Sequence, residues 1–217
     1  RFGAPQKRLQ LSAQPMAVLS DAPAIEVFAS QSLQVGFAAR SMNSAVFGTM
    51  EQIAEMVLAH QFSTGVLWED IRMKGGAYGA FANSNSLENT VSFATYRDPV
   101  PLRSLDTFSA ILKNPSYGSC NEKHLVKSII GCYAKETCPR TAAENGLLDF
   151  YRFLYGIEDS YRKKNRERLV SVSTADITAA FASLGLRPAT GTVIIAGVKM
   201  AEQAAKALGV EVISLPC

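Results

Sequence analysis

The segment that most constrains the fold of this chain runs from residue 72 to residue 79 and reads Arg-Met-Lys-Gly-Gly-Ala-Tyr-Gly. An amphipathic helical pattern precedes it and an alternating strand pattern follows it. Adjacent glycines at such a junction indicate that the backbone turns sharply there. Arg72 and Tyr78 stand on either side of the turn. The segment, called the hinge below, can therefore direct two hydrogen-bonding side chains into one space.

Before the hinge, hydrophobic periodicity predicts one strand and one long helix. Alternation over 33–41 predicts a strand with Leu33, Val35 and Phe37 on one face. Apolar residues at helical spacing then predict a helix over roughly 49–73 that is weakened at Gly65.

After the hinge, two strand patterns separated by a polar connection predict a hairpin, and mostly helical patterns follow. The predicted strands lie at about 77–83, 89–96, 192–198 and 210–214, with an Ala-rich helix between the last two. The predicted helices before them are one opened by Leu105, one with Leu125, Ile129 and Tyr133 on its face, one capped by Thr141 with Glu144 and carrying Leu147, Tyr151 and Leu154, a charged one over about 158–170, and one from Ser173 with Ile177, Phe181 and Leu184 on one face and Gly185 as its stop. We expect an α+β fold in which helices pack on one face of an antiparallel sheet, in split-βαβ style. The hairpin argues against a doubly wound sheet.

Length and composition fit one globular domain. The chain has 217 residues, of which 47% are hydrophobic and 19% charged, enough for a real core. Residues 1–25 are rich in Ala, Gln, Ser and Pro, so we interpret them as a lead-in or linker and 26–217 as the domain. The start at Arg1, with no methionine and no signal-peptide pattern, is typical of a piece of a longer polypeptide.

Charge and hydropathy give no support for nucleic acid or membrane partners. The net charge of +3 is too small to favour either. The basic run 162–168 lacks interleaved aromatic residues, so we interpret it as a solvated helix face. No apolar run approaches the roughly 20 residues that a membrane helix needs.

The chain contains no recognisable catalytic centre of its own. His60 and His124 are its two histidines, and neither belongs to a zinc-helix motif, so we expect no metal site here. The four cysteines (Cys120, Cys132, Cys138 and Cys217) form no C-x-x-C pair, and we expect free thiols in a reducing compartment. The order helix, glycines, strand points the negative end of a helix dipole at the hinge, which argues against phosphate binding.

Two interpretations of the hinge remain open on the residues alone. In the structural one, Arg72 compensates the helix dipole, Gly75 and Gly76 end the helix, and Tyr78 is a wetted strand residue. In the functional one, Arg72 and Tyr78 converge to hold a peptide carbonyl or a developing oxyanion.

The run from Leu67 to Gly79 resembles the signature of the pitrilysin/insulinase-like zinc peptidases, and more narrowly the last domain of the presequence-protease subfamily. The likeness covers about residues 30 to 200, because further blocks match in the expected order. These blocks are Ser32-Leu33-Gln34-Val35, Tyr96-Arg97-Asp98-Pro99 with Leu105-Asp106, Lys127-Ser128-Ile129-Ile130-Gly131, Leu154-Tyr155-Gly156-Ile157 and residues 162–168.

The resemblance implies a protein of four related domains whose two halves enclose a chamber. Its N-terminal domain carries the inverted H-x-x-E-H zinc motif, which this chain lacks. It also implies that the family's arginine and tyrosine, matched here by Arg72 and Tyr78, reach across from the C-terminal half to hold substrate and stabilise the tetrahedral intermediate. Gly75 and Gly76 would supply the sharp turn between them.

The function expected from this resemblance is the C-terminal substrate-binding domain of a zinc-dependent endopeptidase that degrades short unstructured peptides. Its partners would be the peptide and the N-terminal catalytic half of the same polypeptide, which would bind the zinc. The piece alone is expected to be inactive. The alternative is a peptidase-like scaffold or substrate-recognition subunit without activity. Bacterial cytoplasm and an organelle matrix both fit free cysteines.

Overall fold

The computed structural model describes residues 24–85 and 87–215. One six-stranded sheet forms its centre, in the strand order β3-β4-β2-β5-β1-β6. The strands are β1 (Ala24–Ser30), β2 (Phe37–Asn43), β3 (Gly79–Asn85), β4 (Thr90–Tyr96), β5 (Ala189–Gly197) and β6 (Val212–Ser214). The α-helices are α1 (Met50–Thr64), α2 (Pro101–Lys113), α3 (Glu122–Thr137), α4 (Ala142–Leu154), α5 (Asp159–Ser171), α6 (Thr174–Leu186) and α7 (Val198–Leu208). A π-helix, η1 (Leu67–Met73), and a 3-10 turn, η2 (Pro115–Gly118), complete the described elements.

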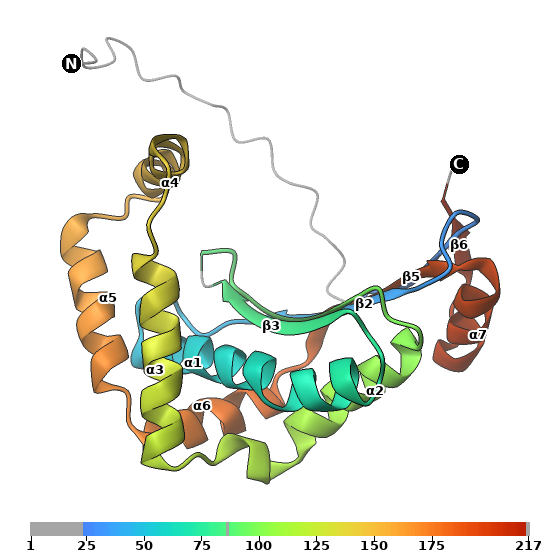
Figure 1. The fold of residues 1–217 in the computed structure, drawn as a ribbon, viewed down its shortest axis with the longest axis horizontal. Coiled ribbons are helices and arrows are strands. Elements are labelled where there is room, and N and C mark those ends of the chain that lie inside the picture. The colour runs from blue at the N-terminus through green and yellow to red at the C-terminus, as the bar shows by residue number, and fades with distance from the viewer. Residues whose placement is uncertain (1–23, 86, 216–217) are drawn as a thin grey trace.

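The predicted α+β class is confirmed, and the helices lie mainly on one face of the sheet (Figure 1). The sheet is mixed, however, rather than wholly antiparallel. Strands β3, β4, β2 and β5 pair antiparallel, whereas β1 pairs parallel with both β5 and β6. The β5–α7–β6 connection makes β5 and β6 run in the same direction, because a helix between two strands brings the chain back that way. Strand β1 lies between them and runs in that same direction. The expected lead-in lies almost wholly outside the described residues, and β1 begins at Ala24.

The long helix predicted before the hinge is two helices. Thr49 has an extended backbone and is the N-cap residue of α1, which ends at Thr64. Gly65 then departs from helical dihedrals, with φ −114° and ψ −106°. The chain then continues as η1 up to the hinge. The predicted weak point at Gly65 is therefore confirmed, while the π-helical winding after it was not predicted.

Three details of the predicted elements are wrong. Strand β2 begins at Phe37 instead of Leu33, so Leu33 and Val35 precede it; its buried side chains are Ala38 and Met42, and Phe37 lies on the opposite, open face. Helix α3 buries Leu125, Ser128 and Cys132 instead of the face through Ile129 and Tyr133. Helix α6 does not end at Gly185 but continues to Leu186. Gly185 faces the Leu112 carbonyl oxygen, 2.9 Å from where a Cβ would stand, so the glycine permits a close approach of α2 and α6.

The core lies between the sheet and its helical layer. Its largest fully buried side chains include Phe93 on β4, Phe108 on α2 and Leu58 on α1. Within the part of the chain that the structure describes, no single helix is long and apolar enough to cross a membrane. The pair α5 and α6, bent by 103°, passes such a test by length and composition only.

Candidate functional site

The hinge joins the end of η1 to the start of β3, the strand at one edge of the sheet (Figure 1). Backbone bonds close the turn: the Gly76 N–H donates to the Arg72 carbonyl at 3.0 Å, and the Ala77 N–H donates to the Ile71 carbonyl at 3.1 Å. Ala77 is buried and so anchors the turn against the core. The hinge is thus a defined structure rather than a loose connection.

Both glycines are required by this geometry. A Cβ at Gly75 would overlap the carbonyl oxygen of Ile71, which is backbone and cannot move aside. Gly76 has φ +79°, a left-handed conformation that other residues adopt at a cost of about 1–2 kcal/mol. The predicted sharp turn at Gly75 and Gly76 is therefore what the structure contains.

Arg72 and Tyr78 both project from this turn to the surface. Arg72 is exposed, and its guanidinium forms no hydrogen bond or ion pair with the residues that the structure describes. Tyr78 is 67% exposed, and its backbone N–H donates to the Arg97 carbonyl at 3.3 Å. Within the described ranges no hydrogen bond joins the two side chains. Each donor is therefore available to a ligand.

The segment Tyr96 to Pro99, which begins with the last residue of β4, lies against the hinge. Gly36 and Asp98 exchange two backbone hydrogen bonds of 2.7 Å each. The carboxylate of Asp98, which is only 2% exposed, accepts from the Val100 N–H at 2.8 Å and from the Ser104 hydroxyl at 2.6 Å. It thereby ties the segment to the first turn of α2, while the Gly36 bridge ties it to the residue before β2.

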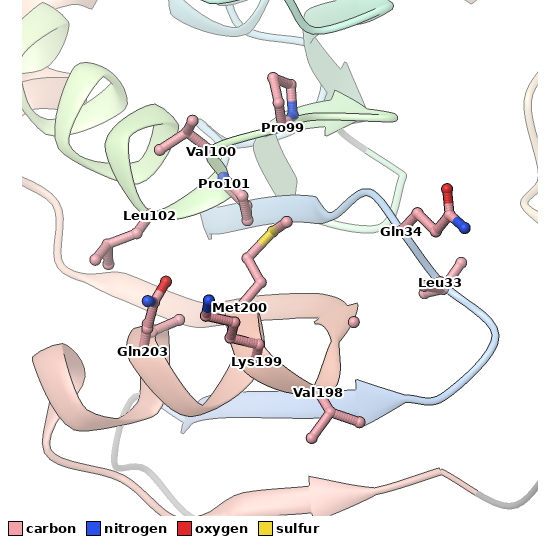
Figure 2. A pocket seen from close by; sticks show the side chains of 12 residues that line it. Leu33, Gln34, Pro99, Val100, Pro101, Leu102, Val198, Lys199, Met200 and Gln203 are labelled. Carbon is pink, nitrogen blue, oxygen red and sulfur yellow. The ribbon is translucent and has the colours of Figure 1, made fainter.

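An apolar cavity of about 480 Å³ lies beside this segment (Figure 2). Its lining residues are Leu33, Gln34, Pro99, Val100, Pro101, Leu102, Gly197, Val198, Lys199, Met200, Gln203 and Ala204. Figure 2 shows Met200 extending from α7 toward Pro101. Pro99 also contacts the hinge, since its Cγ would lie 3.6 Å from a Cβ placed on Gly76. The cavity and the hinge are thus neighbours at the same end of the sheet.

The described residues do not fit a zinc ion. Among residues 24–85 and 87–215, no group of three or more His, Cys, Asp or Glu side chains could hold a metal. His124 is exposed. His60 lies on α1 and packs against Gly131 of α3. Burial of the imidazole, and secondarily the positive charge of Lys135, lower the pKa of His60. The described part of the chain therefore offers no metal centre.

The described cysteines are free thiols. Cys132 is buried against α1, and burial raises the pKa of its thiol to about 11, so it is a poor nucleophile. Cys120 is partly buried and Cys138 is exposed, while Cys217 lies outside the described residues. A reducing compartment stays a prediction.

Comparison with known proteins places the hinge in a family. Residues 32–197 match the family described as the PreP C-terminal domain. The chain belongs to this family. It is 34% identical over 134 residues to the mitochondrial presequence protease of Kluyveromyces lactis, covering 60% of this chain and 13% of that protein. It is 26% identical over 183 residues to the mitochondrial presequence protease of Schizosaccharomyces pombe, covering 82% of this chain and 18% of that protein.

Solved structures show the same fold at low identity. Pitrilysin matches 89% of this chain with 22% of its own length, at 13% identity and a TM-score of 0.60. The inactive peptidase domain of a zinc protease from Bordetella parapertussis matches 73% of this chain with 92% of its own, at 14% identity and a TM-score of 0.61. The chain thus spans less than a fifth of the curated relatives above and most of one inactive peptidase domain.

The matched span of the PreP C-terminal domain includes the hinge and the Tyr96–Pro99 segment but ends before α7. The sequence pattern marked Tyr96-Arg97-Asp98-Pro99 as a family block but assigned it no role. The structure shows that it contacts the hinge through Tyr96, Arg97 and Pro99. The sequence signal for this contact was that both blocks belong to the same family pattern.

Proposed function

We propose that this chain is the C-terminal, substrate-holding domain of a zinc-dependent endopeptidase that degrades short unstructured peptides. The observation that carries the proposal is the hinge: Arg72 and Tyr78 are exposed and their donor groups form no hydrogen bond or ion pair with the described residues, yet they flank a tightly bonded turn. A turn fixed in this way can present both donors to a ligand in one geometry. Membership of the PreP C-terminal domain family supports the peptidase context.

The two side chains suit a peptide carbonyl whose oxygen gains negative charge. Arginine stays charged at all working pH values and offers a fork of donors, whereas a tyrosine hydroxyl donates without adding charge. Donors fixed before the reaction stabilise a developing oxyanion more than the neutral carbonyl, and so lower the barrier. Arg72 and Tyr78 would act in this way, and Gly75 and Gly76 would set their separation. The zinc would be bound by the N-terminal half of the same polypeptide, the proposed partner of this domain.

The test uses the full-length protein with Arg72→Ala and Tyr78→Phe. We expect each to lower kcat/KM for an unstructured peptide on the order of 10²-fold, as the loss of one oxyanion donor does. Tyr133→Phe is the matched control, because Tyr133 is an exposed tyrosine of α3 and should leave kcat/KM unchanged. Unchanged kcat/KM in both hinge variants would contradict the proposal.

The separated 217-residue chain provides a second test. We expect it to hydrolyse no peptide even with added zinc, because its described residues form no metal site. Hydrolysis by the chain alone would overturn the assignment as an accessory domain.

The competing function is a peptidase-like scaffold or recognition subunit. It is kept because the matched Bordetella parapertussis structure is named an inactive peptidase domain. A scaffold would bind peptide in the full-length protein without hydrolysing it, and Arg72→Ala would then change only the dissociation constant. Measuring binding and hydrolysis with the same fluorescent peptide separates the two functions.

A further inference from the structure

The ring of Tyr78 stands at the end of a row of aromatic side chains on the open face of the sheet. Tyr78 and Tyr96 meet edge to face with ring centroids 5.8 Å apart and an interplanar angle of 69°. Tyr96 in turn meets Phe37 edge to face at 5.6 Å and 66°. Such T-shaped contacts are the geometry that aromatic pairs prefer. Tyr96 therefore sits between a partly buried ring and the exposed ring of Tyr78.

The strand register leaves room for the contact. Gly79 of β3 is directly opposite Tyr96 of β4. A Cβ on Gly79 would lie 3.6 Å from the Cβ of Tyr96, so a full side chain there would compete for the same surface. Because position 79 carries no side chain, that surface of Tyr96 is open to the ring of the preceding residue, Tyr78.

The two partners differ in how firmly they are held. Tyr96 ends a strand that is paired on both sides, and the residues after it are fixed by the Gly36–Asp98 bridge and by the bonds of the Asp98 carboxylate to Val100 and Ser104. Tyr78 follows a glycine turn and is 67% exposed, against 46% for Tyr96. An exposed tyrosine has several staggered side-chain rotamers open to it, so a contact with a fixed ring selects among them.

We infer that Tyr96 is the positioning residue for the Tyr78 phenol, and that it acts through ring contact rather than by touching substrate. The inference rests on the proposed function of Tyr78. Holding one rotamer in advance places the hydroxyl donor where charge develops, without a reorganisation cost during the reaction. The Tyr96–Pro99 segment thereby gains a functional role, because it carries the ring that aims the hinge tyrosine.

The test compares Tyr96→Ala, Tyr96→Phe and Tyr78→Phe in the full-length protein, singly and combined. We expect Tyr96→Ala to lower kcat/KM roughly 3- to 10-fold, the range of an aromatic pair contact. The fall should appear in kcat with KM unchanged, because the aimed donor acts in the transition state. Tyr96→Phe keeps the ring and should stay within about twofold of the parent protein. In the Tyr78→Phe background, Tyr96→Ala should add less than about twofold, since no hydroxyl remains to be aimed.

Phe81→Ala is the matched control. Phe81 is 47% exposed on β3, almost the same as Tyr96, but forms no ring contact with Tyr78 in the described structure. It should leave kcat and KM unchanged. Independent effects of Tyr96→Ala and Tyr78→Phe would overturn the inference, as would a rise in KM alone or a Tyr96→Phe variant as impaired as Tyr96→Ala.

A readout without activity separates this inference from the proposed function. With 3-fluorotyrosine at position 78 of the full-length protein, Tyr96→Ala should shift or broaden the ¹⁹F resonance, whereas Phe81→Ala should not. An unchanged resonance in Tyr96→Ala would refute the positioning contact. A shifted resonance combined with normal kcat/KM in Tyr78→Phe would retain the contact and remove the proposed function.

Discussion

At the scale of single residues, the buried carboxylate of Glu55 shows how distant segments are joined. Glu55 on α1 is 1% exposed and accepts hydrogen bonds from the Ser44 hydroxyl at 2.8 Å and from the Ala45 N–H at 2.9 Å. Arg187, which follows α6, pairs with it and also donates to the Asn43 carbonyl at 2.8 Å. The pair therefore fixes the connection between β2 and α1 against the end of α6.

Arg187→Met should destabilise the chain strongly. It leaves the Glu55 carboxylate buried without its counter-charge, and breaking a buried pair in this way costs about 3–5 kcal/mol. Equilibrium urea unfolding of the 217-residue chain measures the change in the free energy of unfolding. Arg152→Met is the control, because Arg152 pairs with Asp149, whose side chain is 69% exposed, and such surface pairs contribute only about 0–1 kcal/mol. Equal losses in both variants would contradict the prediction.

At the scale of elements, the hinge shows that one residue type has opposite effects in different places. Gly75 is in contact with the backbone of the preceding helix, while Gly146 lies within α4 with nothing within 4 Å of a Cβ. Alanine is therefore destabilising at the first position, where it overlaps the Ile71 carbonyl, and favoured at the second by helix propensity.

Gly75→Ala should lower the free energy of unfolding by about 1–3 kcal/mol, the usual cost of overpacking. Gly146→Ala should raise it by about 0.5–1 kcal/mol, because glycine is a poor helix former. Urea unfolding of both variants checks the two signs together. A stabilising Gly75→Ala would show that the hinge relaxes easily, and so would remove the structural reason for a fixed Arg72–Tyr78 geometry.

Most elements could be predicted because their patterns are local. Thr141 with Glu144 forms the predicted capping box of α4, and Ile177, Phe181 and Leu184 form the buried face of α6. The errors arise where residues distant in the sequence determine which face is buried or which strands pair. Hydrophobic periodicity alone did not determine which face of α3 is buried, because that face depends on where α1 and α5 lie. Nor could local pattern show that β1 would pair parallel with β5, which lies far along the chain.

At the scale of the whole molecule, α4 stands away from the sheet and has no buried residue (Figure 1). Its exposed apolar side chains are Leu147, Phe150, Tyr151, Phe153 and Leu154. The predicted apolar face of this helix is therefore real but uncovered in the described structure. Contiguous exposed apolar surface of this kind favours association.

The 217-residue chain alone should self-associate through α4. Replacing both Phe150 and Phe153 with Ser should weaken the association, and should change the free energy of unfolding by no more than about 0.5 kcal/mol because both side chains are exposed. Sedimentation velocity over a range of concentrations measures the first effect and urea unfolding the second. Val126→Ser with Ile130→Ser on α3 is the control pair, with exposures of 54% and 61%. Loss of association in the control alone would place the contact on α3.

The sequence by itself determined the α+β class, the order of most elements, the turn at Gly75 and Gly76, and the family resemblance that the PreP C-terminal domain match confirms. These follow from local dihedral preferences and hydrophobic periodicity, which neighbouring residues set. Only the tertiary structure decided that β1 is parallel to β5, that Tyr96 meets Tyr78, and that Asp98 fixes the Tyr96–Pro99 segment. Such contacts join residues far apart in the chain, and they exist only once the packed sheet has brought those residues together.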